Sequence, residues 1–554
     1  MIMTKNRISA FSYKMVVKAL LMLCIFTSCA HLMETSPSTD VDKSVILEDD
    51  KSIEVAMNGV YSTMYNRLNF VTANAHQCFG NMAVTLAADL MGEDMVQTAE
   101  GAGWFWKDYS YETRERYTSK IQRCYFTWKY FYEIINNVNY ILSVENTATG
   151  DKANIQYLMS QAYAVRAFAY FMLIQSYQQT YIGHESAPGV PIYTEPTLSS
   201  SKGKGRGTVQ DVYDQILSDI SRALVGFQSC GMVQKYITEM DYYATNMLLA
   251  RVSLVMNDWE TAISAAREVM KKPGCTLLTI EDATIEKGLF NPSDKSWVTG
   301  KTPFNSINSS SVIWGAKVLT EQSTVYASFF SQMDACTNLY YAAEAPKCIS
   351  NWLYAQIPDT DIRKSWWNGD IGIPVDKWHY GANINYNQHK FQWADQKSYT
   401  GDYIFMRLEE AYLIEAEAQC RLANYDAAKK ALLEIGTRRD YAYQSKIRNL
   451  SGNEQTFASC GKVQTLMDEI LLQRRIELWG ETGRIFDILR LKKGWTRTWE
   501  INGNPSNHTN TLSKYPEYAN FPPDYIECIL MIPQTELDNN PNITTEDQNP
   551  YIQY

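Results

Sequence analysis

The chain has residues that could carry out acid–base chemistry, but not in the spacing of a known catalytic motif. Its six histidines include no HExxH pair, and none lies near a GxSxG nucleophile elbow. Four glutamates follow one another along a segment with helical periodicity: Glu409, Glu410, Glu415 and Glu417. A glycosidase needs two carboxyl groups that face each other across about 5–9.5 Å, and two distant carboxylates could still do so. A hydrolase therefore stays open as an alternative, although no motif favours it.

Aromatic side chains are the stronger chemical signal. The chain has 14 Trp, 37 Tyr and 19 Phe, which make up 13% of a sequence that is otherwise not very hydrophobic. Half of the tryptophans fall between residues 272 and 400, among Gly, Asn, Ser and Asp. Flat aromatic faces beside polar side chains suit ligand stacking as well as core packing. We therefore expect some of these rings to face a ligand.

Loop segments provide the candidate residues for such a site. The Gly-rich segment 92–112, GEDMVQTAEGAGWFWKDYSYE, is expected to join two helices and to expose its aromatic residues. The segments SWWNGD (365–370) and DKWHYGANINYNQ (376–388) combine aromatic residues with amides, and neighbouring tryptophans cannot both point inward on a strand. The candidate ligand-binding residues are Trp104, Trp106, Asp108, Tyr109, Trp367, Trp378 and Tyr380. Core packing is the alternative for each of them, and it is our expectation for Trp297, Trp314 and Trp393.

The segments that must hold these loops are mainly helical. Residues 157–179 place small and apolar residues on one stripe, as expected for a helix that another helix approaches closely. Pro188, Gly189 and Pro191 prevent its continuation. Thr208 with Asp211 three residues later is a capping-box-like start for the next helix.

Two further segments, 246–270 and 415–435, resemble each other. When Trp259 is aligned with Tyr425, three more pairs match: Ala250 with Ala416, Asp258 with Asn424, and Ala262 with Ala428. Small residues where paired helices touch and an aromatic residue at the turn are typical of tetratricopeptide-type helical hairpins. We therefore predict a mainly α fold, a scaffold of helical pairs with a large loop-rich insertion at about 272–400 that carries short strands such as SSVIWGAKV (310–318).

One more helix is expected over residues 466–493, with Leu471, Ile476, Trp479, Phe486 and Leu489 turned inward. Its charged residues could be mistaken for a catalytic carboxylate cluster: Arg474, Arg475, Glu477, Arg484, Asp487 and Arg490. Their spacing suits ion pairs within and between helices, so we interpret the array as structural.

Charge and cysteine usage exclude several classes of protein. The net charge of −10 and the absence of a Lys/Arg cluster beyond the first residues argue against nucleic-acid binding. Past those residues no apolar run reaches the length of about 18 that a membrane-spanning helix needs. Cys24 and Cys29 belong to the N-terminal signal described below, which leaves nine of the 11 cysteines. Because an odd number cannot all pair, at least one free thiol is expected. None of the nine forms a CxxC pair, so a structural zinc site is not expected.

The N-terminal residues read as an export signal. Lys5, Arg7, Lys14 and Lys18 precede the short apolar run 19–26 and the small residues Thr27 and Ser28. The pattern ends in Cys29 and resembles the lipobox of bacterial lipoproteins, in which that cysteine is acylated and becomes the first residue after cleavage. We predict a lipoprotein signal peptide at 1–28 and a lipidated Cys29 with a polar tether over 29–54; a signal cut elsewhere is the alternative.

Taken in order along the chain, several segments resemble the SusD/RagB lipoproteins of Bacteroidetes-type outer membranes. After the lipobox come YEIINNVNYIL (132–142), AYAVRAFAYFMLIQSY with GVPI (189–192), GRGTVQDVYDQILSDI and LLARVSLVMNDWETAI. They are followed by RLEEAYLIEAEAQ (407–419), RRIELWGETGRIFDILR (474–490), IPQTEL (532–537) and the terminal QNPY. Each segment alone is a weak signal, but the ordered set covers nearly the whole chain.

The resemblance implies one SusD-like domain over 55–554. Its helical scaffold spans about 55–271 and 401–500, the aromatic-rich insertion 272–400, and an extended tail 501–554. Members capture glycans, or in some cases peptides, as a lid on a SusC-type TonB-dependent transporter and carry out no chemistry. Sugars present C–H faces that pack on aromatic rings and hydroxyls that need polar partners, and the loop 92–112 commonly contributes to the ligand site in the family.

The resemblance also sets our expectations for partners and location. We expect a glycan ligand, a SusC-like transporter, attachment to the outer membrane through the lipid alone, facing the exterior, and no nucleic acid. We expect no cofactor, although some members hold calcium. A surface glycoside hydrolase and a protein-binding or peptide-binding helical scaffold remain the alternatives.

Overall fold

A computed structural model describes residues 47–66, 75–111, 122–198, 200–291, 293, 296–298, 300–335, 341–372, 384–508 and 519–550. The predicted signal peptide, Cys29 and most of the tether lie outside these ranges, and so do Trp378 and Tyr380. Among the described helices none is both long and apolar enough to span a membrane.

The architecture is mainly α-helical, as predicted. The long helices form the scaffold: α3 (Asp50–Thr63), α4 (Asn81–Met91), α6 (Gln122–Leu142), α7 (Lys152–Tyr177), α8 (Val209–Cys230), α9 (Tyr242–Val255), α10 (Trp259–Val269), α15 (Leu408–Arg421), α16 (Tyr425–Gly436), α18 (Leu466–Glu477) and α19 (Arg484–Leu491). Shorter ones are η1 (Ala75–Gln77), α5 (Trp106–Ser110), α11 (Ile280–Ala283), η2 (Pro303–Asn305), α12 (Phe329–Met333), α13 (Tyr341–Glu344), α14 (Asn351–Ala355), η3 (Ile362–Trp366), α17 (Tyr443–Ile447), η5 (Ile526–Cys528), α21 (Gln534–Asn539) and η6 (Thr545–Asp547).

The strands are short, and in the described residues each pairs with a single partner. The antiparallel pairs are β1 (Met95–Gln97) with β5 (Lys347–Ile349), β2 (Leu289–Asn291) with β3 (Ser296–Val298), β4 (Val312–Ala316) with β6 (Tyr403–Arg407), β7 (Trp495–Thr496) with β10 (Asn520–Phe521), and β8 (Glu500–Ile501) with β9 (Asn504–Pro505). The predicted strand in SSVIWGAKV is β4. Because β6 leads directly into α15, the β4–β6 pair joins the insertion to the scaffold.

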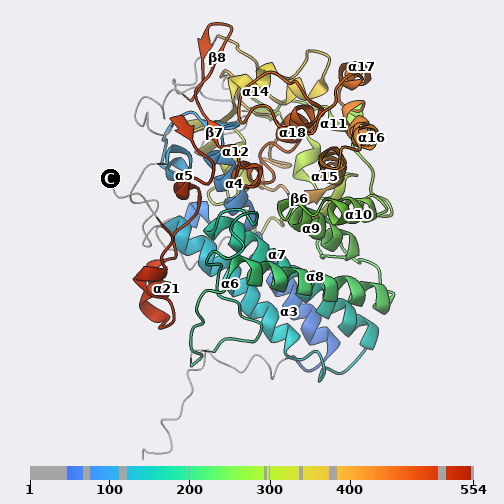
Figure 1. The fold of residues 1–554 in the computed structure, drawn as a ribbon, viewed down its shortest axis with the longest axis vertical. Coiled ribbons are helices and arrows are strands. Elements are labelled where there is room, and N and C mark those ends of the chain that lie inside the picture. Colours follow the sequence, from blue (N-terminus) through green and yellow to red (C-terminus); the bar gives the residue numbers. More distant parts are fainter. Residues whose placement is uncertain are drawn as a thin grey trace, which may run out of the picture.

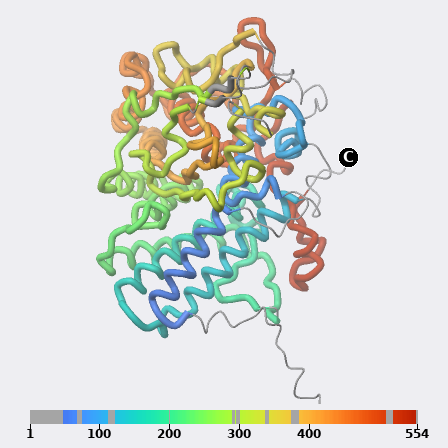
Figure 2. Tube along the Cα trace, turned by 180° about the vertical axis from the view of Figure 1, so that it is seen from behind, coloured from blue at the N-terminus to red at the C-terminus, as the bar shows by residue number. Residues whose placement is uncertain are grey.

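Helix α7 lies at the centre of the lower layer, between α6 and α8 and against α3 (Figure 1). Its small residues Ala162, Ala164, Ala167 and Ala169 are all 0% exposed, which lets the neighbouring helices approach closely. Thr208 caps α8 with the predicted capping box: its side chain accepts from the backbone of Asp211, whose own side chain accepts from the Thr208 N–H. The insertion lies above the layer of α3, α6, α7 and α8 (Figure 2), and its helix α12 contacts the N-terminal helix α4.

The predicted alignment of the two hairpins is confirmed at the backbone. Asn257 and Ala423 both adopt left-handed φ, 59° and 61°, at the turn between the paired helices. The next residues, Asp258 and Asn424, are both N-caps, and each donates its N–H to the carbonyl oxygen five residues earlier at 2.9 Å. Helix α10 packs on α15, so the two hairpins stack although the insertion separates them in sequence.

Two predicted boundaries were wrong. The tether was expected to reach residue 54, but α3 begins at Asp50 and buries Ile53 completely, so the folded body already includes residue 47. The single helix expected over 466–493 is divided into α18 and α19. Gly480 and Gly483 have left-handed φ of 77° and 78°, which ends one helix and turns the chain before the next.

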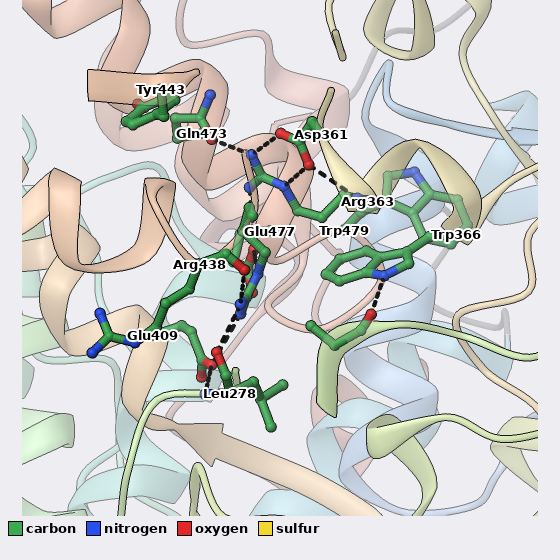
Figure 3. Close-up of polar contacts among 12 residues, drawn as sticks. Leu278, Asp361, Arg363, Trp366, Glu409, Arg438, Tyr443, Gln473, Glu477 and Trp479 are labelled. Atoms are coloured by element: carbon green, nitrogen blue, oxygen red, sulfur yellow. Dashed lines mark hydrogen bonds and ion pairs between the residues drawn. The ribbon is translucent and has the colours of Figure 1, made fainter. Parts of the chain in front are cut away.

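The charged array of this region is structural, as predicted. Glu477 is fully buried, and its carboxylate contacts Arg407 at 2.8 Å, Arg439 at 3.0 Å and Arg363 at 3.1 Å. Figure 3 shows Arg363 lying close to Asp361 and Gln473, with which it hydrogen bonds. Burial opposes ionisation of Glu477, but the three guanidiniums outweigh it and hold the pKa of this carboxyl well below its usual range. This buried charge network fixes the insertion residue Arg363 to scaffold helix α18.

Candidate functional site

Four aromatic rings gather at the surface where the insertion meets the segments just before and just after α4. The ring centroid of His76 lies 4.9 Å from that of Trp104, 5.8 Å from Tyr326 and 5.3 Å from Tyr341. Trp104 also meets Tyr341 edge-on at 5.6 Å. We call these four residues the aromatic cluster.

The aromatic cluster is open to solvent on one side. Tyr326 is 42% exposed, and the other three rings are half-buried. Tyr341 Oη and His76 Nδ1 form a 2.5 Å hydrogen bond, which holds the two rings together. Burial raises the pKa of Tyr341, so its hydroxyl stays protonated at neutral pH and can take part in hydrogen bonds. A platform of rings with a hydroxyl and an imidazole at the surface can hold a flat, polyhydroxylated ligand.

The loop that carries Trp104 is fixed from below. Gln97 lies on β1 opposite Lys347 of β5 and donates its side-chain amide to the Trp104 carbonyl oxygen at 3.2 Å. The Phe105 N–H donates to Gln77 Oε1 at 2.7 Å, so the Trp104 loop is tied to the short helix that carries His76. Phe105 adopts a left-handed φ of 59°, a costly conformation for a non-glycine residue, which persists because its own N–H and the Trp104 carbonyl are both held by hydrogen bonds.

The turn that carries Tyr326 is tied to two distant segments. Gln322 donates its side-chain amide to Tyr65 Oη at 3.1 Å, and Ser323 donates its hydroxyl to the Ser398 carbonyl oxygen at 2.6 Å. The cluster is therefore built on held segments from the N-terminal scaffold and from the insertion.

Three residues predicted to bind ligand from the same loop face the interior instead. Trp106, Asp108 and Tyr109 are 2%, 3% and 0% exposed. Asp108 pairs with Arg123 at 3.3 Å, and Tyr109 Oη hydrogen bonds with His508 Nδ1 at 2.9 Å. The expectation that the loop exposes them was wrong, because α5 turns this half of it into the core. Their contacts hold the loop in place beneath Trp104.

Of the ligand-binding candidates predicted in the insertion, the one that the structure describes, Trp367, is also buried. Trp367 is 2% exposed and meets Trp479 edge-on at 5.6 Å, so it belongs to the core. The strand argument for its exposure failed because Trp366 ends η3 and Trp367 follows it, and this bend lets both rings point inward. Trp314 and Trp393 are buried, as predicted, at 0% and 5% exposure. Trp378, Tyr380 and the side chain of Trp297 lie outside the described residues.

Sequence reasoning missed three members of the cluster: His76, Tyr326 and Tyr341. No periodicity or motif marks them, and the segments that carry them are about 250 residues apart in the sequence. The useful signal was local: a tryptophan in a Gly-rich loop, with Gly101 and Gly103 in left-handed conformations.

Two exposed carboxylates lie in the segments that form the cluster. Glu100 precedes the glycine turn, and Glu344 ends α13. A Cβ atom added at Gly101 would lie 3.2 Å from Glu344 Cβ, so the two segments touch. These side chains can accept hydrogen bonds from a bound hydroxylated ligand. Across the described part of the chain, no three His, Cys, Asp or Glu side chains come together as a group that could hold a metal ion.

Fold and site together define a helical-pair scaffold protein whose loops and insertion present aromatic rings at the surface. Two family models match: residues 325–551 match the SusD family, and residues 48–254 match a family described as starch-binding associating with outer membrane. The chain belongs to the SusD family.

Similar proteins agree with this assignment. The SusD-like protein P38 of Formosa agariphila is 24% identical over 416 residues, which are 68% of this chain and 74% of that protein. The crystal structure of a SusD-like carbohydrate binding protein from Bacteroides vulgatus is 23% identical and superposes with a TM-score of 0.69, covering 91% of this chain and 99% of that one. A laminarin-binding SusD-like protein is 17% identical, with a TM-score of 0.61 and coverage of 91% and 100%. At these identities the structural matches establish the fold.

Proposed function

We propose that the protein binds oligosaccharides at the aromatic cluster and delivers them, without chemistry, to a SusC-like TonB-dependent transporter. The observation that carries the proposal is the group of His76, Trp104, Tyr326 and Tyr341 rings open to solvent on one side. Names of similar proteins that refer to carbohydrate, laminarin and starch support the same ligand class.

The geometry suits a sugar chain in two respects. Sugar C–H faces can pack on the half-buried rings of Trp104 and Tyr341 and on the exposed ring of Tyr326. Hydroxyl groups can bond to the Tyr341–His76 pair and to Glu344. The cluster is shallow, so binding should be modest in strength, which suits a protein that must release its ligand to a transporter.

Delivery requires a place at the outer membrane. We propose that Cys29 carries the lipid and that the protein faces the cell exterior beside its transporter. The description of one matching family as associating with the outer membrane supports this location. Co-purification of the membrane-extracted protein with a TonB-dependent barrel tests the partner, and isolation without such a barrel contradicts it.

The ligand is tested with protein that starts after Cys29, so that every described residue is kept. Wild type, Trp104→Ala and Tyr326→Ala are compared on a glycan array and by calorimetry. Each substitution should weaken binding about 5- to 10-fold, since a stacked ring contributes about 1–1.5 kcal/mol. Tyr441→Ala, which removes an 80% exposed ring between α16 and α17, is the control and should bind as wild type does. Unchanged affinity in both cluster variants would refute the proposed site.

The enzymatic alternative is tested on the same mixtures by product analysis. We expect no cleavage products after long incubation. Products that disappear in a Glu344→Gln variant would reassign the protein to the glycoside hydrolases. A wild-type protein that binds no glycan on the array but does bind peptides or another protein would favour the scaffold or peptide-binding alternative.

A further inference from the structure

A second groove, separate in its lining from the aromatic cluster, runs between α6, the segment 193–203 and α21. It has a volume of about 840 Å³ and opens to solvent. This size falls in the range of small-molecule sites. None of the four residues of the aromatic cluster lines it.

One wall of the groove is a face of α6. Tyr125, Tyr132 and Asn136 follow at spacings of seven and four residues, which places them on one side of the helix. The rings of Tyr125 and Tyr132 are half-buried. Beneath them Trp128 is 5% exposed, and its ring centroid lies 4.8 Å from that of Tyr132. The groove therefore has an aromatic floor along one helix.

The other two walls are fixed rather than loose. The Asn136 side chain accepts a hydrogen bond from the Thr197 N–H at 2.8 Å and donates one to the Thr197 carbonyl oxygen at 3.3 Å. These two bonds tie the segment that contains Thr197 to α6. Trp128 Nε1 donates to Glu536 Oε2 at 3.2 Å, which ties α21 to the same helix.

The two outer walls are also bonded to each other. Asn540 donates its side-chain amide to the Lys204 carbonyl oxygen at 2.9 Å, and Asn542 donates to the Gly203 carbonyl oxygen at 2.6 Å. A Cβ atom on residue 203 would lie only 2.1 Å from Asn540 Oδ1, so glycine is what allows the walls to meet. A groove held on three sides loses little conformational entropy when a ligand binds.

The chemistry of the lining favours an uncharged, hydroxyl-rich ligand. Two lysines, Lys129 and Lys202, are matched by two glutamates, Glu133 and Glu536. Exposed Ser201, Thr535 and Asn539 provide hydroxyl and amide groups for hydrogen bonds. Because α6 is a helix of 21 residues, most of its backbone groups are bonded within it, so this wall provides no strand edge for an extended peptide.

We propose that this groove is a second binding site of the protein and takes a neutral oligosaccharide along the Tyr125–Tyr132 face of α6. The inference rests on the proposed glycan-binding function but not on the aromatic cluster itself.

The test fills the groove without removing packing. Thr535→Arg adds a long side chain at an exposed position of α21, and Asp538→Arg adds the same residue at an exposed position of that helix outside the lining. Both are compared with wild type and Trp104→Ala on arrays of neutral laminari-, malto-, cello-, xylo- and manno-oligosaccharides and by calorimetry. We expect Thr535→Arg to weaken the affinity for oligosaccharides of six or more sugars at least 3-fold and Asp538→Arg to leave this affinity unchanged. The Trp104→Ala/Thr535→Arg double variant should have a lower affinity than either single variant.

The outcomes separate the two proposals. A binding profile of Thr535→Arg that equals that of Asp538→Arg overturns the groove as a glycan site, whatever Trp104→Ala does. Unchanged binding by both Trp104→Ala and Tyr326→Ala, together with lost binding by Thr535→Arg, supports the groove and overturns the aromatic cluster. Binding of a peptide library that Thr535→Arg abolishes would assign the groove to peptides and overturn the inference. A wild type that binds no glycan would overturn both proposals.

Discussion

Glu477→Gln should strongly destabilise the protein, because this carboxylate is shared by three buried arginines. Arg363, Arg407 and Arg439 are 0%, 2% and 1% exposed in their side chains, and each lies within 2.8–3.1 Å of a Glu477 oxygen. Glutamine keeps the shape and one acceptor oxygen but removes the negative charge. Three guanidiniums would then share the remaining carboxylates of the network in a dry environment.

The magnitude follows from the cost of leaving a buried charge without its partner. Breaking a buried ion pair by removing one member costs about 3–5 kcal/mol. The arginines still contact three other carboxylates in the variant: Glu409, Glu481 and Asp361. Because these remaining ion pairs compensate in part, the expected loss of unfolding free energy stays at about 3–5 kcal/mol and is not the sum of three broken pairs. With an m-value of about 3 kcal/mol/M, the urea midpoint should fall by roughly 1 M or more.

The assay is urea unfolding followed by tryptophan fluorescence, with a matched control. Glu434→Gln makes the same change in a pair with Arg438 whose side chains are 42% and 40% exposed, and it should shift the unfolding free energy by less than about 0.5 kcal/mol. A Glu477→Gln midpoint that coincides with the Glu434→Gln midpoint would show that the network contributes no net stability and would refute the reasoning.

Three further predictions concern pH, metal and anchoring. Burial raises the pKa of Asp89 to about 8, so between about pH 4 and 8 the folded state holds a proton that the unfolded state has released, and stability is lost as pH rises through this range. Asp89→Asn keeps the acceptor for the Arg484 N–H and should therefore be more stable than wild type by about 3–5 kcal/mol at pH 8 and similar to it at pH 4. Equal unfolding midpoints at pH 8 would contradict this. Dialysis against EDTA should leave oligosaccharide affinity within twofold, and a loss that calcium restores would reveal a metal-dependent site. Cys29→Ala should move the full-length protein from the membrane fraction to the soluble fraction, and retention in the membrane would exclude the lipid anchor.

The helical scaffold could be predicted because its determinants are local. Capping at Thr208, the small-residue stripe of 157–179 and the aligned turns at Asp258 and Asn424 depend on residues within a few positions of one another. The break at Gly480 was missed because the apolar and charged pattern continues through it in helical register. Two glycines in left-handed conformations outweighed that pattern.

Of the described residues predicted to bind ligand, only Trp104 lies in the aromatic cluster. Composition shows that many rings exist but does not show which of them are covered. Tyr109 is buried against His508 and Trp367 against Trp479, partners that lie far along the chain. His76, Tyr326 and Tyr341 meet only through the tertiary fold. Exposure of an aromatic residue is a property of the whole packing arrangement, so local pattern could not decide it.

The aromatic cluster joins a segment near the N-terminus to a segment from the middle of the chain, and the two are synthesised at different times. His76 and Trp104 emerge early, but their ring partners Tyr326 and Tyr341 follow more than 200 residues later. The strand that backs the loop, β5, also comes from the later segment. A chain synthesised only as far as Trp104 would therefore lack two of the four rings and the strand β5. The proposed ligand site therefore forms only after both segments have folded together, so an incomplete chain lacks it.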